Sequence, residues 1–159
     1  MPETAWPRLR RATNADREQI TSLVYAVLQE YGLAPDPDDT DADLYDIEQS
    51  YFARGGSFAV LEEDDGSIVG SYGLYPIDSE SCELRKMYLA REYRGRGHGR
   101  RLLEDALQKA RSLDFRRVTL ETASVLKEAI CLYESHGFTP CRADHLSARC
   151  DQAYQLALL

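Results

Sequence analysis

The sequence predicts a mixed α/β (α+β) fold, in which one mixed β-sheet is flanked by helices in the order β-α-α-β-β-β-α-β-α-β. Two long segments, 20–31 and 102–113, carry apolar residues at helical spacing. Short segments of strand-like composition lie around them and end at turn residues. No linker, internal repeat or low-complexity tract divides the 159 residues, so we expect a single domain over residues 1–159.

The first part of the chain predicts a strand followed by a helix. Residues 7–13 (PRLRRAT) are typical of a short strand, and Thr13 or Asn14 is suited to cap the helix that follows. Gly32 suits the end of this helix, because glycine readily adopts the left-handed conformation found there. The apolar stripe that predicts the helix consists of Ile20, Leu23, Val24, Val27, Leu28 and Tyr31.

A loop, a second helix and a hairpin come next. The segment 34–48 is rich in Pro and Asp and predicts the loop, and we expect the helix near Leu44–Phe52. Residues 57–63 and 67–77 predict two strands. The turn signal at 64–66 (DDG) indicates that these strands form a hairpin.

The second half of the chain alternates strands and helices. We expect strands at 82–90, 116–122 and 152–159, a long helix that begins at Gly99, and a short helix at 127–135. The apolar face of the long helix consists of Leu102, Leu103, Ala106, Leu107, Ala110 and Leu113.

Composition argues against several classes of protein. A net charge of -8 does not fit nonspecific binding to nucleic acid, which needs a basic face. No apolar run reaches the roughly 18 residues of a membrane span, and residues 1–13 lack the apolar stretch of a secretory signal, so we expect a cytoplasmic location. The four cysteines and three histidines show no metal-ligand spacing, so we expect no metal and free thiols.

Residues 93–103 (YRGRGHGRRLL) place three glycines and several arginines between a predicted strand and a predicted helix. The first N–H groups of a helix lack intrahelical partners, and glycines let a ligand approach the backbone closely. Arg94, Arg96 and Arg100 can pair with phosphate oxygens. The segment therefore indicates a phosphate-bearing small ligand, and the alternative is a turn with solvated arginines. Its spacing fits neither the P-loop nor the GxGxxG dinucleotide fingerprint.

Two segments resemble the GNAT superfamily of N-acetyltransferases. The first is RGRGHG at 94–99, which is similar to the Q/R-x-x-G-x-G/A pyrophosphate loop of that family. The second comprises LET at 120–122 and AICLYESHGF at 129–138. The resemblance extends over nearly the whole chain, because the predicted elements follow the same order. It implies a splayed central sheet and acetyl-CoA as cofactor.

The resemblance also implies which residues bind the cofactor. In this family the strand before the loop separates from its neighbour, and its backbone pairs with the pantetheine arm. That backbone corresponds to Met87, Tyr88 and Leu89, and Arg94 opens the loop. The amides implied to hold the pyrophosphate are those of Gly95, Arg96, Gly97, His98, Gly99 and Arg100. His98 departs from the family, in which an aliphatic residue is common, and we interpret it as a packing residue rather than a catalytic one.

Three residues are candidates for catalysis. Tyr133 matches the family's usual general acid, which protonates the leaving thiolate, and its alternative role is core packing. The base that deprotonates the amine is Glu121 or Glu83, directly or through water, and we rank Glu121 slightly ahead. The alternative for either carboxylate is a solvated or salt-bridged strand residue. Leu126 stands where many relatives have an Asn, so no role is transferred to it.

The acceptor is predicted to be a small amine, which attacks the thioester carbonyl directly. In this family the first two helices and their connection form one wall of the acceptor site. Here that region is acidic, which favours a cationic amine. The alternative is that the acidic residues only keep the loop solvated. The acidic residues are Asp36, Asp38, Asp39, Asp41, Asp43, Asp46 and Glu48. Rival hypotheses are a peptide or protein acetyltransferase, acting on an N-terminus or a lysine, and a catalytically silent acyl-CoA-binding module. Many relatives are dimers, so a homodimer is a further expectation.

Overall fold

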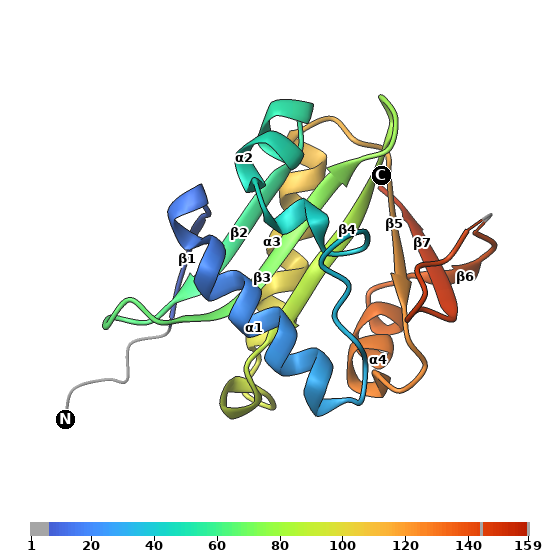
Figure 1. Cartoon of the computed structure of the whole chain (residues 1–159). Helices are drawn as coiled ribbons and strands as arrows, with labels where there is room; N and C mark the ends of the chain where they lie inside the picture. The colour runs from blue at the N-terminus through green and yellow to red at the C-terminus, as the bar shows by residue number, and fades with distance from the viewer. Residues whose placement is uncertain (1–6, 144, 159) are drawn as a thin grey trace.

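The computed structural model describes residues 7–143 and 145–158, and it contains one seven-stranded sheet in the order β1-β2-β3-β4-β5-β7-β6 (Figure 1). The predicted extension of the last strand to Leu159, and residues 1–6 and 144 of the predicted domain, lie outside the described residues. The strands are β1 (Arg8–Arg11), β2 (Ser57–Glu62), β3 (Ile68–Pro76), β4 (Ser81–Leu89), β5 (Arg117–Thr122), β6 (Thr139–Cys141) and β7 (Gln152–Ala157). The α-helices are α1 (Arg17–Glu30), α2 (Ile47–Ser50), α3 (His98–Ser112) and α4 (Lys127–Ser135).

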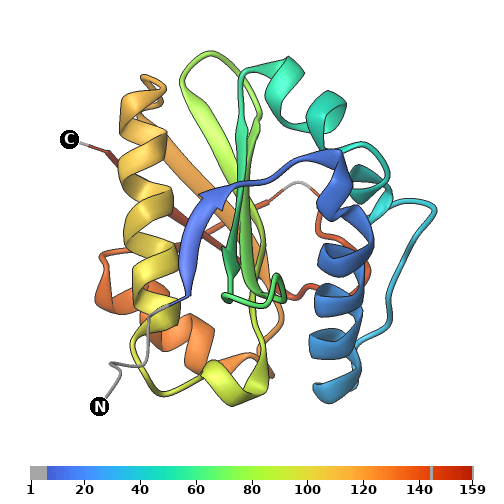
Figure 2. The same ribbon diagram turned by 90° about the vertical axis from the view of Figure 1, so that its left-hand side faces the viewer.

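The helices cover both faces of the sheet, which confirms the predicted fold class. Figure 2 shows the strands in the middle, with α3 and α4 on one side and α1 on the other. Two cores result, because each face of the sheet buries its own helices. One core joins α1 and α2 to β2, for example through Ile20, Ile47 and Phe58. The other joins α3 and α4 to the opposite face.

Local sequence signals explain where the first helical segment begins and ends. The Thr13 hydroxyl accepts a hydrogen bond from the Ala15 amide at 3.2 Å, and the Asp16 carboxylate accepts one from the Thr13 amide at 2.9 Å. Thr13 is therefore the cap of the 3₁₀ turn Asn14–Asp16 that leads into α1, and its reciprocal pairing with Asp16 forms a capping box. Gly32, with φ +71°, follows the other end of the helix.

The structure corrects the sequence prediction at two places. The expected helix at Leu44–Phe52 is only one α-helical turn, α2, between the 3₁₀ turns Ala42–Leu44 and Phe52–Arg54. Asp46 leaves the helical region, with φ -144° and ψ 89°, and its carboxylate caps a new turn by accepting from the Gln49 amide. The strand β6 was not predicted, because it has three residues with Pro140 in the middle and pairs only with β7 at the sheet edge.

The two central strands β4 and β5 separate along their length (Figure 1). Their parallel pairing ends at Glu83 and Thr119, although β4 continues to Leu89 and β5 to Thr122. In the antiparallel pairing with β3, β4 carries an extra residue at Lys86, which has a φ of +55°. The structure therefore contains the splayed sheet that the family resemblance implies. No helix in the described part of the chain is long and apolar enough to cross a membrane.

Candidate active site

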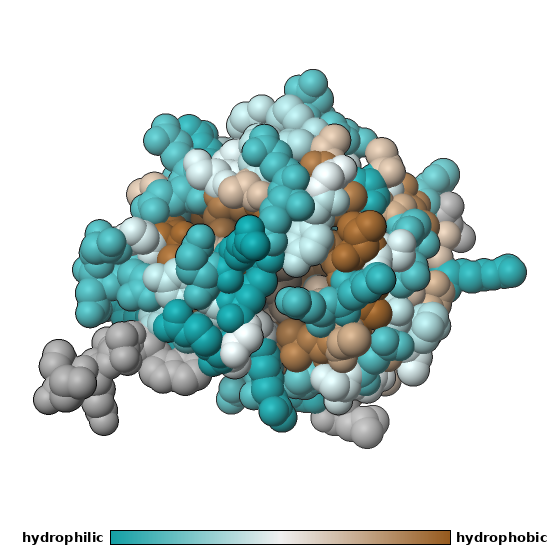
Figure 3. Space-filling model, turned by 90° about the horizontal axis from the view of Figure 1, so that it is seen from below, coloured by the Kyte–Doolittle hydropathy of each residue, from teal (hydrophilic) through white to brown (hydrophobic). Residues whose placement is uncertain are grey.

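A cavity of about 650 Å³ lies where β4 and β5 separate. Viewed from below, apolar side chains gather around a hollow in the middle of this face, and hydrophilic side chains surround them (Figure 3). Of the predicted site residues, the cavity is lined by Glu83, Met87, Tyr88, Leu89, Arg94, Gly95, Gly97, Gly99, Arg100, Glu121 and Tyr133. The structure thus brings both predicted motifs to one cavity, whereas Arg96 and His98 are not among its lining residues.

One end of the cavity, which we call the loop end, is formed by residues 94–100. Gly95 and Gly97 have φ values of +73° and +86°, a conformation that favours glycine. The first amides of any helix lack intrahelical acceptors. Gly97 is the N-cap of α3 and has no side chain to accept from these amides. A Cβ atom at Gly95 would meet nothing within 4 Å, which indicates open space beside the backbone. The loop end is suited to an anion held by amides.

The arginines of the loop mainly hold protein groups. Arg94 binds the Glu30 carboxylate at the end of α1, with Nη2 3.0 Å from Oε1, and its Nε donates to the Leu89 carbonyl at 3.1 Å. Arg100 pairs with Glu104 at 2.9 Å. Arg96 donates to the Glu92 carbonyl at 3.3 Å. A phosphate would therefore have to compete with these protein groups for the arginines. The backbone amides of the loop are the stronger argument for anion binding.

His98 begins α3 and is buried, with 2% of its surface exposed. Its ring centroid lies 6.0 Å from that of Tyr93. Burial and the neighbouring Arg96 and Arg101 lower the pKa of His98, which favours the neutral ring. These contacts agree with the interpretation of His98 as a packing residue.

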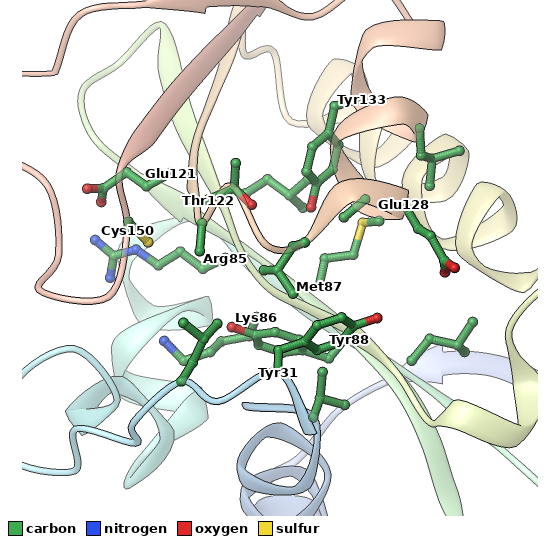
Figure 4. Close-up of a pocket in the computed structure, with 18 of the residues that line it drawn as sticks. Tyr31, Arg85, Lys86, Met87, Tyr88, Glu121, Thr122, Glu128, Tyr133 and Cys150 are labelled. Atoms are coloured by element: carbon green, nitrogen blue, oxygen red, sulfur yellow. The ribbon is translucent and has the colours of Figure 1, made fainter. Parts of the chain in front are cut away.

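Tyr133 lies on α4, and its side chain forms part of the cavity wall. Figure 4 shows its hydroxyl directed toward β4, where Met87 lies. The residue is 6% exposed, and its ring packs with Phe138 at a ring-centroid distance of 5.7 Å. Burial, followed by the nearby Tyr88 and Cys150, raises the pKa of Tyr133 well above that of a free phenol. The hydroxyl therefore stays protonated at neutral pH and can donate a proton or a hydrogen bond.

The opposite end of the cavity, which we call the ion-pair end, holds both candidate carboxylates. Glu83, on β4 at the last paired position, forms an ion pair with Arg85. Glu121, on β5, accepts a hydrogen bond from the Ser147 amide at 2.9 Å. In Figure 4 Glu121 and Arg85 lie at the same end and Glu128 at the other. Both candidates thus reach the cavity and both already have partners.

Three further cavity residues at the ion-pair end were missed by sequence reasoning. Lys86 is buried and lies 3.2 Å from the carboxylates of both Asp41 and Asp43. Arg149 donates to the two carboxylate oxygens of Asp41 at 2.8 and 2.7 Å. Cys150 also lines the cavity, and burial raises its pKa to about 11. Alternation puts Lys86 at a buried position of the predicted strand, but nothing in the sequence indicates that a bulge turns its side chain toward Asp41 and Asp43.

The acidic segment 36–48 is used mostly within the protein. Asp41 and Asp43 bind the cations described above, and Tyr51 donates a hydrogen bond to Asp43. Asp46 and Glu48 bind Asn14, through its side chain and its backbone amide respectively. Of the seven acidic residues, Asp39 is the one that lines the cavity. The segment therefore presents less negative charge to a ligand than its sequence suggests.

Comparisons with known proteins agree with this geometry. A model of the acetyltransferase (GNAT) family matches residues 22–138. The uncharacterized N-acetyltransferase YjgM of Escherichia coli (strain K12) is 40% identical over 137 residues, which cover 83% of this chain and 81% of that protein. Human N-acetyltransferase 8B is 32% identical over 101 residues, or 60% of this chain, but the match spans only 44% of its length.

Solved structures show the same fold. A GNAT acetyltransferase from Staphylococcus aureus Mu50 superposes with a TM-score of 0.89 at 22% identity, covering 96% of this chain and 99% of that one. The structure of yncA from Salmonella typhimurium, solved with its cofactor acetyl-CoA, superposes with a TM-score of 0.70 at 26% identity, covering 96% and 94%. The chain belongs to the GNAT family of acetyltransferases and is an acetyl-CoA-dependent acyltransferase.

Proposed function

We propose that this acetyl-CoA-dependent enzyme acetylates a primary amine of a small acceptor. The observation that carries this proposal is the separation of β4 and β5. Their pairing ends at Glu83 and Thr119, and the cavity that opens beyond it is lined by Met87, Tyr88 and Leu89, by the glycines of the loop end and by Tyr133. A donor, a proton source and an amine therefore have room to meet between the two strands.

The cofactor acetyl-CoA fits the residues of the loop end. The amides of residues 95–100 would hold its pyrophosphate, because they lie at a helix N-terminus with open space beside Gly95. The backbone of β4 at Met87, Tyr88 and Leu89 would pair with the pantetheine arm, since β5 no longer occupies that edge of the strand. When bound, acetyl-CoA supplies the acetyl group as a reactive thioester.

The residues around the cavity support direct transfer with acid–base assistance. Tyr133 is protonated at neutral pH and donates a proton to the leaving sulfur. Glu121 or Glu83 takes the proton from the acceptor ammonium, through water if neither touches the amine. Cys150 is unsuited to carry the acyl group, because a thiol with a pKa of about 11 is neutral near pH 7.

The nature of the acceptor is the finer part of the proposal. A small primary amine fits a cavity of this size, whose ion-pair end mixes acidic residues with Arg85, Lys86 and Arg149. A cationic acceptor draws little support from the segment 36–48, because Asp41 and Asp43 are paired with buried cations. The peptide or protein acetyltransferase and the silent acyl-CoA binder remain the alternatives to be separated by experiment.

Two measurements test the proposal. Acetyl-CoA near saturation should raise the melting temperature, because a ligand that binds only the native state stabilises it. A panel of primary amines with acetyl-CoA, scored by release of free thiol, should then yield turnover with at least one small amine. Stabilisation without turnover on any amine or peptide would favour the silent binder, and turnover on peptides alone would favour the second alternative.

The identity of the base is tested by the pH dependence of kcat/KM. Replacing the base with Gln should remove the limb on which the rate rises as the base loses its proton. Glu83→Gln and Glu121→Gln are the two test variants, and Glu128→Gln is a matched control at the loop end of the same cavity. If both test variants keep that limb, the proton leaves by another route.

A further inference from the structure

Two loops that are far apart in the sequence meet over the ion-pair end of the cavity. The segment 36–43 follows α1, and the segment 145–150 precedes β7. Their meeting point is the two-pronged ion pair of Arg149 with Asp41, in which Nη1 lies 2.8 Å from Oδ2 and Nη2 lies 2.7 Å from Oδ1. Both segments contribute lining residues, so the position of one loop against the other shapes the cavity.

Lys86 ties this pair to β4. Its Nζ lies 3.2 Å from Asp41 Oδ1 and donates to the Thr40 carbonyl at 3.0 Å. The residue stands at the β4 bulge with φ +55°, an uncommon conformation for a residue with a side chain. Bulges redirect side chains next to functional sites. Here the bulge directs the lysine toward the 36–43 loop.

Ser147 ties the other loop to β5. Its amide donates to Glu121 Oε1 at 2.9 Å, and its hydroxyl lies 3.4 Å from Oε2. A bridge therefore runs from Glu121 through Ser147, Arg149 and Asp41 to Lys86, in which the backbone links Ser147 to Arg149 and polar contacts make the other links. The strands β4 and β5 last pair at Glu83 and Thr119. The two ends of the bridge, Lys86 on β4 and Glu121 on β5, lie beyond these residues, so the bridge spans the gap between the strands.

The ionic part of the bridge is buried, whereas Glu121 and Ser147 are partly exposed. The exposed fractions of the side chains of Asp41, Lys86 and Arg149 are 0%, 4% and 10%. Apolar side chains of similar volume often stabilise a protein at least as well as buried ion pairs do. A fixed arrangement of charges at a cavity wall therefore suggests a positioning role beyond stability.

We propose that this bridge sets the opening of the ion-pair end and so decides which amines are acetylated. Arg149 is the specificity-determining residue, because it lines the cavity while Asp41 holds its guanidinium group by two hydrogen bonds. Asp41 and Lys86 are positioning residues that act through it. This inference rests on the proposed function, in which the acceptor amine occupies the ion-pair end.

The test compares Arg149→Met with Arg149→Lys and with the control Arg142→Met. Arg142 is exposed and lies in the same connection between β6 and β7. The probes are glycine, L-glutamate, L-lysine, spermidine, 2-phenylethylamine and tetra-alanine, each with acetyl-CoA. We expect Arg149→Met to change the ratios of kcat/KM among the accepted amines by roughly tenfold, with the Kd of acetyl-CoA within about twofold of wild type. Arg149→Lys keeps the positive charge but lacks the two-pronged guanidinium, so its kcat/KM ratios should lie between those of wild type and those of Arg149→Met.

Hydrogen exchange of the Ser147 amide gives a readout that needs no acceptor. Arg149→Met should reduce its protection, whereas Arg142→Met should not. If wild type accepts none of the probes, the acceptor claim of the proposed function fails, and lost protection at Ser147 would still support the bridge. Unchanged amine ratios or unchanged protection overturn the inference. So does an equal loss of acetyl-CoA binding and turnover, because that pattern marks a purely structural role.

Discussion

The two ends of the cavity differ in the chemical groups that form them. The loop end comes from one continuous segment, residues 94–100, and offers backbone amides to a ligand. The ion-pair end comes from β4, β5 and two distant loops, and it offers charged side chains held by one another. A substitution at the loop end acts through backbone conformation and space, whereas one at the ion-pair end acts through charge. The proposed pyrophosphate site is therefore local in sequence, and the proposed acceptor site is not.

Tyr133 lies between the two ends and should show the largest effect. Tyr133→Phe removes the proposed proton donor but keeps the ring packed against Phe138, so kcat should fall by about 10²-fold or more while the Kd of acetyl-CoA stays unchanged. Single-turnover kinetics and calorimetric titration measure the two quantities. Tyr154→Phe is the matched control, because that residue is also buried but does not line the cavity. Unchanged turnover in Tyr133→Phe would remove Tyr133 as the acid.

The loop end is tested by two glycines that differ in conformation. Gly97→Val puts a branched side chain at φ +86°, and the left-handed strain and crowding should raise the Kd of acetyl-CoA by roughly tenfold or more. Gly99→Ala is the control at the same end of the cavity, in the first turn of α3. A Cβ atom there would lie 3.6 Å from Leu132 Cδ2, an ordinary contact, so the Kd should change by less than about threefold. Equal effects of the two variants would contradict an amide-built site.

The same contrast explains how far the sequence could predict the molecule. The helices α1, α3 and α4 follow from periodicity, since each buries one face against the sheet. The strands β4 and β5 alternate in burial, whereas β2 and β3 are buried on both faces and follow from their composition and the turn between them. The glycine segment is informative because its residues are consecutive and its glycines permit the positive φ angles of the turn. The single turn α2 and the edge strand β6 are too short for periodicity to detect.

The ion-pair end could not be predicted in this way. Asp41 and Arg149 are 108 positions apart, and each looks in the sequence like an ordinary surface charge. Lys86 continues the alternation of buried residues along β4, but the sequence gives no reason to expect a cation at such a position, and the direction of its side chain depends on the bulge in the register with β3. For the same reason, the sequence leaves two interpretations of the acidic segment 36–48, a wall facing a cationic ligand or a solvated loop, and neither includes buried ion pairs. Only tertiary contacts show that Asp41 and Asp43 serve buried cations.

The smallest expected effect is a pH dependence confined to the ion-pair end. Burial alone would raise the pKa of Asp41, but hydrogen bonds from Arg149 and the Asp36 amide, with the charge of Lys86, outweigh it and hold that pKa below its ordinary value. Because the folded-state pKa is the lower one, ionised Asp41 stabilises the protein fully above the unfolded-state pKa of about 4, and this stabilisation is lost as the pH falls through the folded-state pKa. The difference in Tm between wild type and Asp41→Asn should therefore be constant from about pH 8 to pH 5 and shrink below about pH 4. Backbone amides do not titrate in this range, so the difference in Tm between wild type and Gly97→Val should show no such decrease. A parallel decrease in both variants would mean that acid unfolds the molecule as a whole, and would count against separate control of the two ends.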